Sequence, residues 1–343
     1  MIWLAWRQFC LPGAAVFAGL AALAVVLALT GPGLAREYAA GIAECSGQPD
    51  GCADFIRQFL SDYDNAFAIV TGLVLILPPL IGLFWGAPLI ARELETGTHR
   101  LVWNQSITRT RWLAVKLGLV GLATMAAAAL GSLSVTWWAS TLDLNGDNDA
   151  FPRLSSLVFD ARGIVPIGYA AFAFALGMAV GMLMRRALPA MAVTLVAFAA
   201  IQIAVPSLVR PYLLPPTTAT VALSPSILDG ISRPVSGDGM EIRAKAPDPG
   251  AWLLSSRTVD ASGNTVAEIP VSTTSGPCAP SGRPQDSIAR CLDELNRLGY
   301  RQQLTYHAPS RFWPLQWIEA GVYLALAAAL AGFSFWWLRR RLS

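Results

Sequence analysis

The polar segment 91–116 carries most of the residues whose types and spacing could do chemistry. Two carboxylates stand two residues apart directly after a long apolar run, a Gly-Thr pair follows them, and an aromatic side chain and basic residues come next. Charged groups beside an aromatic side chain are suited to docking a partner protein. The alternative is a solvated loop that only turns the chain. The candidate contacts are Glu93, Glu95, Gly97, Thr98, Trp103 and Arg109.

Glu319 is the one carboxylate inside an otherwise uncharged apolar run. Ionisable residues within a membrane-spanning segment often mark a transport path, so Glu319 is a candidate gate or substrate contact. The alternative is an interfacial carboxylate that reaches water or Arg311. A single carboxylate near the end of a span is a poor proton relay, which argues against an ion-coupled secondary transporter.

Four of the five cysteines lie in two polar segments that are separate in the sequence. The local pairings are Cys45–Cys52 and Cys278–Cys291, with Cys10 left as a free thiol, and cross-pairing would need the two segments to meet. Disulfides indicate an oxidising compartment. The cysteines have no histidine beside them, so we expect no metal site.

Motifs of nucleotide hydrolysis and hydrolytic catalysis are absent from the sequence. It contains no Walker A sequence, no Gly-x-Ser-x-Gly and no His-Glu-x-x-His. No cofactor is expected in this chain, and no groove-reading motif suggests nucleic acid. An intramembrane enzyme would need a nucleophile and a base at depth, and the apolar runs hold neither.

The elements that must position these residues are long apolar helices. Apolar residues make up 54% of the chain and charged residues only 14%, against roughly 25% in soluble domains. Each of six runs is close to or above the roughly 20 residues that span a bilayer. The runs are Leu11–Leu29, Ala66–Ile90, Leu117–Ala139, Ile164–Met184, Ala187–Val209 and Trp313–Leu338. We expect an all-α polytopic membrane protein in the plasma membrane.

Charge predicts the orientation of these six spans. With the N-terminus inside, the segments 1–10, 91–116, 185–186 and 339–343 face the cytoplasm and carry eleven cations against two carboxylates, net +9. The rest of the chain carries fourteen cations and twenty carboxylates, net −6, which matches the overall +3. Cytoplasmic loops are normally rich in Lys and Arg, so both termini are predicted to be cytoplasmic.

The runs divide the chain into three parts: a five-span region 1–209, a polar insert 210–312 outside the membrane, and the sixth span with a basic tail, 313–343. Residues 1–10 place aromatic side chains at helical spacing, which suggests a short interfacial helix or a tryptophan belt. The insert is predicted to be small and α+β. Strands are expected at Trp252–Val259, Thr265–Val271 and Tyr300–Tyr306, and a helix at 286–298.

Two stretches resemble a known family. The pattern Arg-Glu-x-Glu-x-Gly-Thr, then Gln-Ser-x-Thr-Arg, then Trp and Lys in 92–116 resembles the inner loop of type-2 ATP-binding-cassette exporter permeases, where it also joins the second and third of six spans. The stretch Ser310–Glu319 and the tail Arg339–Arg341 resemble actinobacterial members. Arginine provides 23 of the 25 cations, which suits a GC-rich bacterial genome. The insert is longer than the element common in the family.

The resemblance implies a membrane subunit that pairs with a second permease copy or homologue and with two cytosolic ATPase subunits, which bind ATP and Mg. It implies coupling through 91–116. The spans offer few polar groups, namely Thr71, Ser134, Thr136 and Gln202, so a lipophilic or amphipathic cargo is expected. The alternative is a membrane-anchored sensor or regulatory subunit whose insert binds a ligand.

Overall fold

The computed structural model describes residues 2–46, 52–97, 108–140, 152–232, 239–272, 275–279 and 284–341. The chain forms two compact units. The first, called here the bundle, comprises Met1–Asn145, Ser155–Leu213 and Trp313–Ser343; the second, the insert, comprises Gly146–Leu154 and Leu214–Phe312. Each unit is described by itself.

The bundle consists of helices that follow the apolar runs. Its elements are α1 (Ile2–Cys45), α2 (Ala53–Ile81), the π-helix η1 (Gly82–Gly86), α3 (Ala87–Glu95), α5 (Arg109–Trp138), α6 (Ser156–Ala161), α7 (Val165–Met184), α8 (Ala187–Ala204), the π-helix η3 (Val205–Val209), the short 3-10 helix η4 (Arg210–Tyr212) and α10 (Phe312–Arg341). Six helical stretches in the described residues are long and apolar enough to cross a membrane. The predicted six-span fold class is confirmed.

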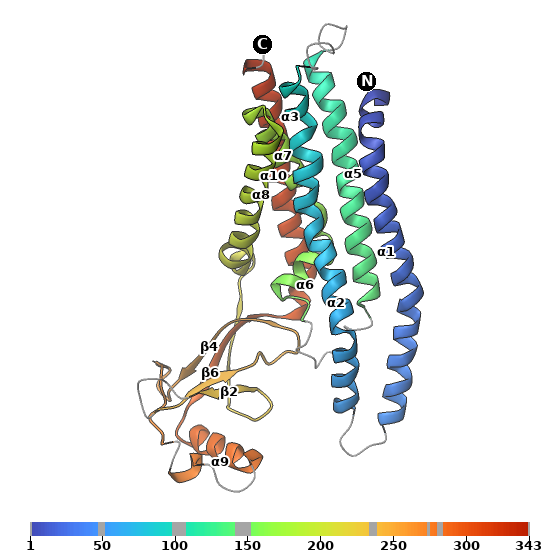
Figure 1. Cartoon of the computed structure of the whole chain (residues 1–343). Helices are drawn as coiled ribbons and strands as arrows, with labels where there is room; N and C mark the ends of the chain where they lie inside the picture. The colour runs from blue at the N-terminus through green and yellow to red at the C-terminus, as the bar shows by residue number, and fades with distance from the viewer. Residues whose placement is uncertain are drawn as a thin grey trace. The chain divides into compact units, whose positions relative to one another are not determined.

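Both ends of the chain lie at the same end of the bundle, which we call the terminal end (Figure 1). The other we call the far end. A separate interfacial helix at residues 1–10 is not present, because α1 is continuous from Ile2 to Cys45 with Pro12 and Pro32 inside it. At about 1.5 Å per residue its 44 residues exceed a hydrocarbon core of roughly 30 Å, so α1 extends beyond the membrane.

At the far end, the Cys45–Cys52 disulfide joins α1 to α2, with the two Cα atoms 5.2 Å apart. Four aromatic rings pack between the helices beside it: Tyr38, Phe55, Phe59 and Tyr63. The hydroxyl of Tyr63 also donates to Glu37, at 2.7 Å. This local pairing of cysteines confirms the prediction.

Close packing between α7 and the second span depends on glycines. A Cβ on Gly177 would lie 2.5 Å from the carbonyl oxygen of Gly82, and one on Gly86 would lie 2.7 Å from that of Phe174. Glycines of the second span and of α7 therefore pack against each other, as small residues do where helices approach closely. The π-helix η1 begins three residues after Pro79, and α2 stays helical through Pro78 and Pro79.

α7 is the central helix of the bundle. In an apolar stretch of 18 residues along α7, 83% of the residues are buried. The corresponding stretches of the first and fifth spans are 11% and 17% buried. Fully buried side chains along α7 include Tyr169 and Met178. The outer faces of α1 and α8 expose large apolar side chains such as Leu29 and Leu188, as expected for helices in contact with lipid.

The insert contains two antiparallel sheets and one long helix. Its elements are β1 (Thr217–Val221), β2 (Leu228–Ser232), β3 (Glu241–Ala244), β4 (Trp252–Val259), β5 (Thr265–Val266), the 3-10 helix η5 (Gly276–Cys278), α9 (Pro284–Arg297), β6 (Arg301–His307) and the 3-10 helix η6 (Pro309–Arg311). The strand order is β1-β6-β4-β5 in one sheet and β2-β3 in the other.

The predicted strand Trp252–Val259 is confirmed residue for residue, and the predicted third strand is β6, displaced by one residue. The strand expected at Thr265–Val271 is shorter, since β5 has only two residues. Leu298 was expected on the buried face of the helix 286–298, but α9 ends at Arg297 and Leu298 is 48% exposed.

The core of the insert lies between α9 and the second sheet. Cys291, Leu292 and Leu295 of α9 are buried against Met240 and Ile242. The Cys278–Cys291 disulfide joins η5 to this helix, with Cα atoms 4.4 Å apart, as the sequence predicted. Cys10 is the free cysteine in the part of the chain that the structure describes.

Candidate functional site

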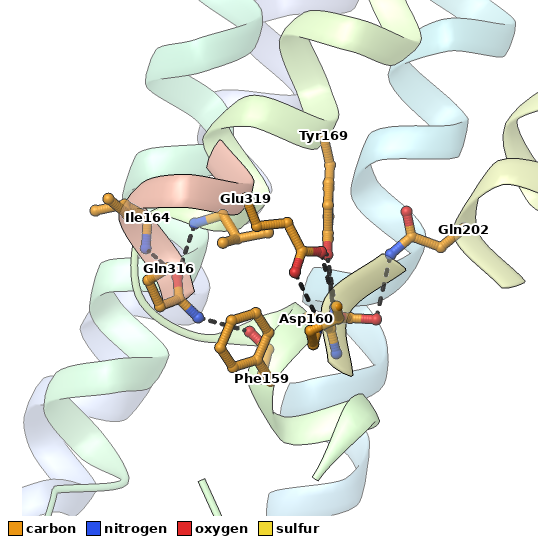
Figure 2. Close-up of polar contacts among 9 residues, drawn as sticks. Phe159, Asp160, Ile164, Tyr169, Gln202, Gln316 and Glu319 are labelled. Carbon is orange, nitrogen blue, oxygen red and sulfur yellow. Dashed lines mark hydrogen bonds and ion pairs between the residues drawn. The ribbon is translucent and has the colours of Figure 1, made fainter. Parts of the chain in front are cut away.

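A cluster of charged side chains is buried in the bundle near its far end. Arg210, the first residue of η4, is 0% exposed, and Glu319 of α10 is 1% exposed. Asp160 comes from α6 and Tyr169 from the first turns of α7. Figure 2 shows Glu319, Tyr169 and Asp160 turned toward one another, so the cluster joins segments that lie far apart in the sequence.

The guanidinium of Arg210 holds both carboxylates. Its Nε donates to Glu319 Oε2 at 2.7 Å and its Nη2 donates to Glu319 Oε1 at 2.8 Å. The same Nη2 donates to Asp160 Oδ1. The guanidinium carbon also lies 4.2 Å from the centre of the Phe159 ring. A two-pronged contact of this kind is the strong form of a charge-assisted hydrogen bond.

Glu319 therefore differs from the interfacial carboxylate that the sequence offered as one alternative. It does not pair with Arg311, which instead donates to the backbone oxygen of Pro215. A buried carboxylate in apolar surroundings needs a partner, and Arg210 provides it. The role of Glu319 as a gate stays a prediction.

Gln316, one turn before Glu319 on α10, fixes the start of α7. Its side-chain oxygen accepts hydrogen bonds from the backbone nitrogens of Ile164 and Val165, at 3.0 and 2.9 Å, and its nitrogen donates to Phe159 O at 3.0 Å (Figure 2). The first backbone nitrogens of a helix lack acceptors within the helix. The side-chain oxygen of Gln316 provides the acceptor for two of them.

Gly163 makes this contact possible, because its φ is +72° and a Cβ there would lie 2.6 Å from Gln316 Oε1. We expect Gly163→Ala to destabilise the bundle by about 1–3 kcal/mol through backbone strain and displacement of Gln316. Thermal unfolding in detergent, followed by tryptophan fluorescence, measures this effect. The control is Gly118→Ala, inside α5 with open space around the position, which should be neutral or stabilising. Equal melting temperatures for the two variants would contradict the assignment.

At the terminal end, Glu93 of α3 forms a partly buried ion pair with Lys116 of α5. The side chains are 15% and 5% exposed. Lys116 also lies 5.0 Å from the centre of the Trp112 ring, and its Nζ is 3.4 Å from Leu89 O. Glu93 is thus engaged within the chain.

Glu95 reaches the start of α8. Its Oε2 accepts a hydrogen bond from the backbone nitrogen of Ala187, the first residue of that helix, at 3.1 Å. A carboxylate is favoured there because the positive end of the helix dipole lies at the N-terminus. Both carboxylates that oppose the cytoplasmic charge bias therefore have partners inside the bundle.

The other residues predicted for this segment are placed as follows. Gly97 follows the end of α3 with φ +72°, a conformation that favours glycine. Arg109 begins α5, whose N-cap is the hydroxyl of Thr108. Thr98 and Trp103 lie outside the described residues. Glu93 and Glu95 both lie at the C-terminal tip of α3, and each contacts a different neighbouring helix.

A cavity of about 440 Å³ opens beside the charge cluster. Its walls come from α2, α6, α7, α8 and η3, and most are apolar. The lining residues are Leu75, Pro78, Ser156, Leu157, Asp160, Tyr169, Phe198, Gln202, Ile203, Pro206 and Ser207. Leu157 and Ile203 are 68% and 74% exposed, so the mouth opens on the outer surface of the bundle.

Sequence reasoning missed Asp160, Arg210 and Gln316. Asp160 lies outside all six apolar runs, and Arg210 was assigned to the insert because it directly follows the apolar run Ala187–Val209. One signal was present: Arg210 directly follows the fifth apolar run and Glu319 is the seventh residue of the sixth, so both charges lie near the same end of the spans. Intramembrane charges pair with one another, so this placement favours a contact.

Comparison with protein families gives one match to the chain. The model of the family described as ABC-2 membrane transporter related matches residues 17–210, more than half of the chain, from within the first span to near the end of the fifth. Comparisons with curated proteins and with solved structures gave no match. With its six spans, the chain belongs to the ABC-2 membrane transporter related family and is a permease-like membrane subunit.

Proposed function

We propose that this chain is the permease subunit of an ATP-driven exporter that moves a lipophilic or amphipathic cargo outward. A separate cytosolic ATPase subunit binds ATP and Mg, and it docks on the segment 91–116. A second copy of this chain or a homologue completes the membrane part. The family supports a permease-like subunit.

The observation that carries the proposal is the pair of contacts at the tip of α3. Glu93 joins α3 to α5 through Lys116, and Glu95 joins α3 to α8 through Ala187. A force applied to the segment between α3 and α5 would reach three spans at once. Rigid-body movement of packed helices is a common way of opening a transport path.

Glu319 is proposed as part of a gate at the other end of the same bundle. It joins α10 to η4, which follows α8, and to Tyr169 of α7. A movement of α8 that starts at Glu95 would therefore act on the Arg210 contacts. This connection supports a coupled opening of the far end.

The test of this proposal begins with the neighbouring genes, one of which we expect to encode a cassette ATPase, and continues with reconstitution of the two proteins. We expect the two proteins to co-purify and the permease in lipid nanodiscs to stimulate ATP hydrolysis. Trp103→Ala should reduce both, because removing a docked aromatic side chain typically costs more than about 1 kcal/mol. Arg340→Ala is the control, since Arg340 only lies over the ring of Trp336 on its own helix. If the parent protein neither co-purifies with the ATPase nor stimulates it, the alternative of a sensor or regulatory subunit is favoured instead.

The orientation is proposed to place the termini inside and the insert outside, on the +9 and −6 division of charge. Cysteine labelling with a membrane-impermeant reagent measures it, in a Cys10→Ser background. We expect a cysteine at Asp248, an exposed position of the insert, to react in intact cells. A cysteine at Arg111, exposed near the start of α5, should react only after the membrane is opened. The reverse pattern would overturn the orientation.

A further inference from the structure

The contacts around Tyr169 favour one hydrogen atom more than the phenol has. Its oxygen lies 2.9 Å from Asp160 Oδ1 and 2.6 Å from Glu319 Oε1, and Arg210 Nη2 donates to it at 3.1 Å. A phenol carries one hydrogen and a carboxylate carries none. A single hydrogen shared between two oxygens makes two weak hydrogen bonds, so a proton on one of the two carboxyl groups would strengthen these contacts.

The net charge of the cluster also favours one additional proton. One guanidinium and two carboxylates sum to a net −1 in a region of low dielectric. A buried charge without a partner is costly, and one proton makes the cluster neutral. Burial raises the pKa of the Asp160 carboxyl, while Arg210 opposes that rise. The other ionisable groups acting on Asp160 are Glu319 and Tyr169, and Tyr323 lies behind Tyr169 with the ring centres 4.6 Å apart.

Asp160 also forms part of the cavity wall. Its Oδ1 faces Arg210 and Tyr169, whereas its Oδ2 accepts one hydrogen bond from Gln202 Nε2, at 3.2 Å (Figure 2). The side-chain oxygen of Gln202 is buried and has no hydrogen-bond partner among the described residues. The wall therefore offers a carboxyl group and an amide acceptor, surrounded by Leu75, Phe198 and other apolar side chains.

We propose that this cavity binds an amphipathic cation, whose positive group takes the place of the proton as the partner of the second carboxylate. The apolar walls hold the body of the ligand, and the mouth on the exposed face of the bundle admits it from lipid. On binding, the carboxylic acid loses its proton to water and no other bond changes. This inference rests on the proposed function only in making the ligand a cargo, since it names the class of that cargo.

The test uses the full chain alone in phosphatidylcholine nanodiscs, without ATPase, so that failure here leaves the coupling proposal untouched. The probe is radiolabelled tetraphenylphosphonium, measured by equilibrium dialysis with empty nanodiscs subtracted. Tetraphenylborate, of the same shape and opposite charge, is the comparison ligand. We expect saturable binding of the cation only. Its affinity should rise about fivefold or more from pH 6 to pH 8, because exchange for one proton allows up to about tenfold per pH unit.

Asp160→Asn should lower the affinity for the cation about tenfold or more and remove the dependence on pH. The Arg210–Glu319 pair is retained in this variant and is neutral, so the bundle should still fold. Asp54→Asn is the matched control, because Asp54 is an exposed carboxylate that pairs with Arg57 on α2. If Asp160→Asn fails to fold, the proposal is judged by the pH dependence of cation affinity in the parent protein. Equal binding of tetraphenylborate, an affinity independent of pH, or full binding by folded Asp160→Asn would overturn the proposal.

Discussion

Replacing Arg210 with methionine is expected to destabilise the bundle by about 3–5 kcal/mol, the range found when one partner of a buried ion pair is removed. Methionine fills much of the same space but leaves Asp160 and Glu319 together without a cation. Even with one of them protonated, the other keeps a charge without a partner, and both lose the hydrogen bonds from the guanidinium. Thermal unfolding in detergent and the fraction of monodisperse protein after size exclusion measure the loss.

Two further variants separate the charge from the packing. Adding Asp160→Asn and Glu319→Gln to Arg210→Met removes the unpaired charges, so this triple variant should recover most of the stability; replacing a whole buried ion pair by neutral groups is often harmless. Arg57→Met is the matched control, because its pair with Asp54 is exposed and worth about 0–1 kcal/mol. Arg210→Met with parental stability would show that the cluster is not a source of stability.

The sequence predicted the six spans because a bilayer imposes a minimum length on any apolar helix. That constraint acts on consecutive residues, so it can be seen without the tertiary structure. The same holds for β4 and for the disulfides, whose cysteines are 7 and 13 residues apart. Strands β1, β2 and β3 were missed because they have only five, five and four residues, too few for an alternating pattern to stand out in the sequence.

The charge cluster could not be derived in the same way. Its acidic and basic members lie 50 and 109 residues apart, on helices whose packing is set by α7 and its glycines. Asp160 and Arg210 each look like ordinary loop charges until α6 and η4 are placed beside α7. The candidate gate at Glu319 was found from sequence because it alone interrupts an apolar run.

The interpretation of Glu93 and Glu95 changes for a related reason. In the sequence they appeared to lack partners, and an external protein was the simplest explanation. The structure provides an internal partner for each, Lys116 and the first nitrogen of α8. Reversal of both charges would therefore damage the bundle itself, contrary to the expectation that isolated surface charges contribute little. Loss of ATPase stimulation in that double variant would not by itself locate a docking site.

A charge exchange between Glu93 and Lys116 separates stability from coupling. Glu93→Lys alone places two ammonium groups together in a mostly buried site, so we expect a loss of about 3–5 kcal/mol and poor recovery of protein. Glu93→Lys with Lys116→Glu restores opposite charges and should recover most of the stability. The contribution of the contact between Lys116 and the Trp112 ring is not recovered. Thermal unfolding measures both variants, and ATPase stimulation is then measured on the exchanged protein.

We expect the exchanged protein to stimulate the ATPase nearly as the parent does, because Glu93 is only 15% exposed and acts by positioning α3 against α5. Trp103→Ala in the same background should still reduce stimulation, as it should in the parent. A folded exchanged protein that no longer stimulates would show that Glu93 itself contacts the partner. An unstable exchanged protein would show that the geometry around Trp112 and Leu89, rather than charge alone, selects Lys at position 116.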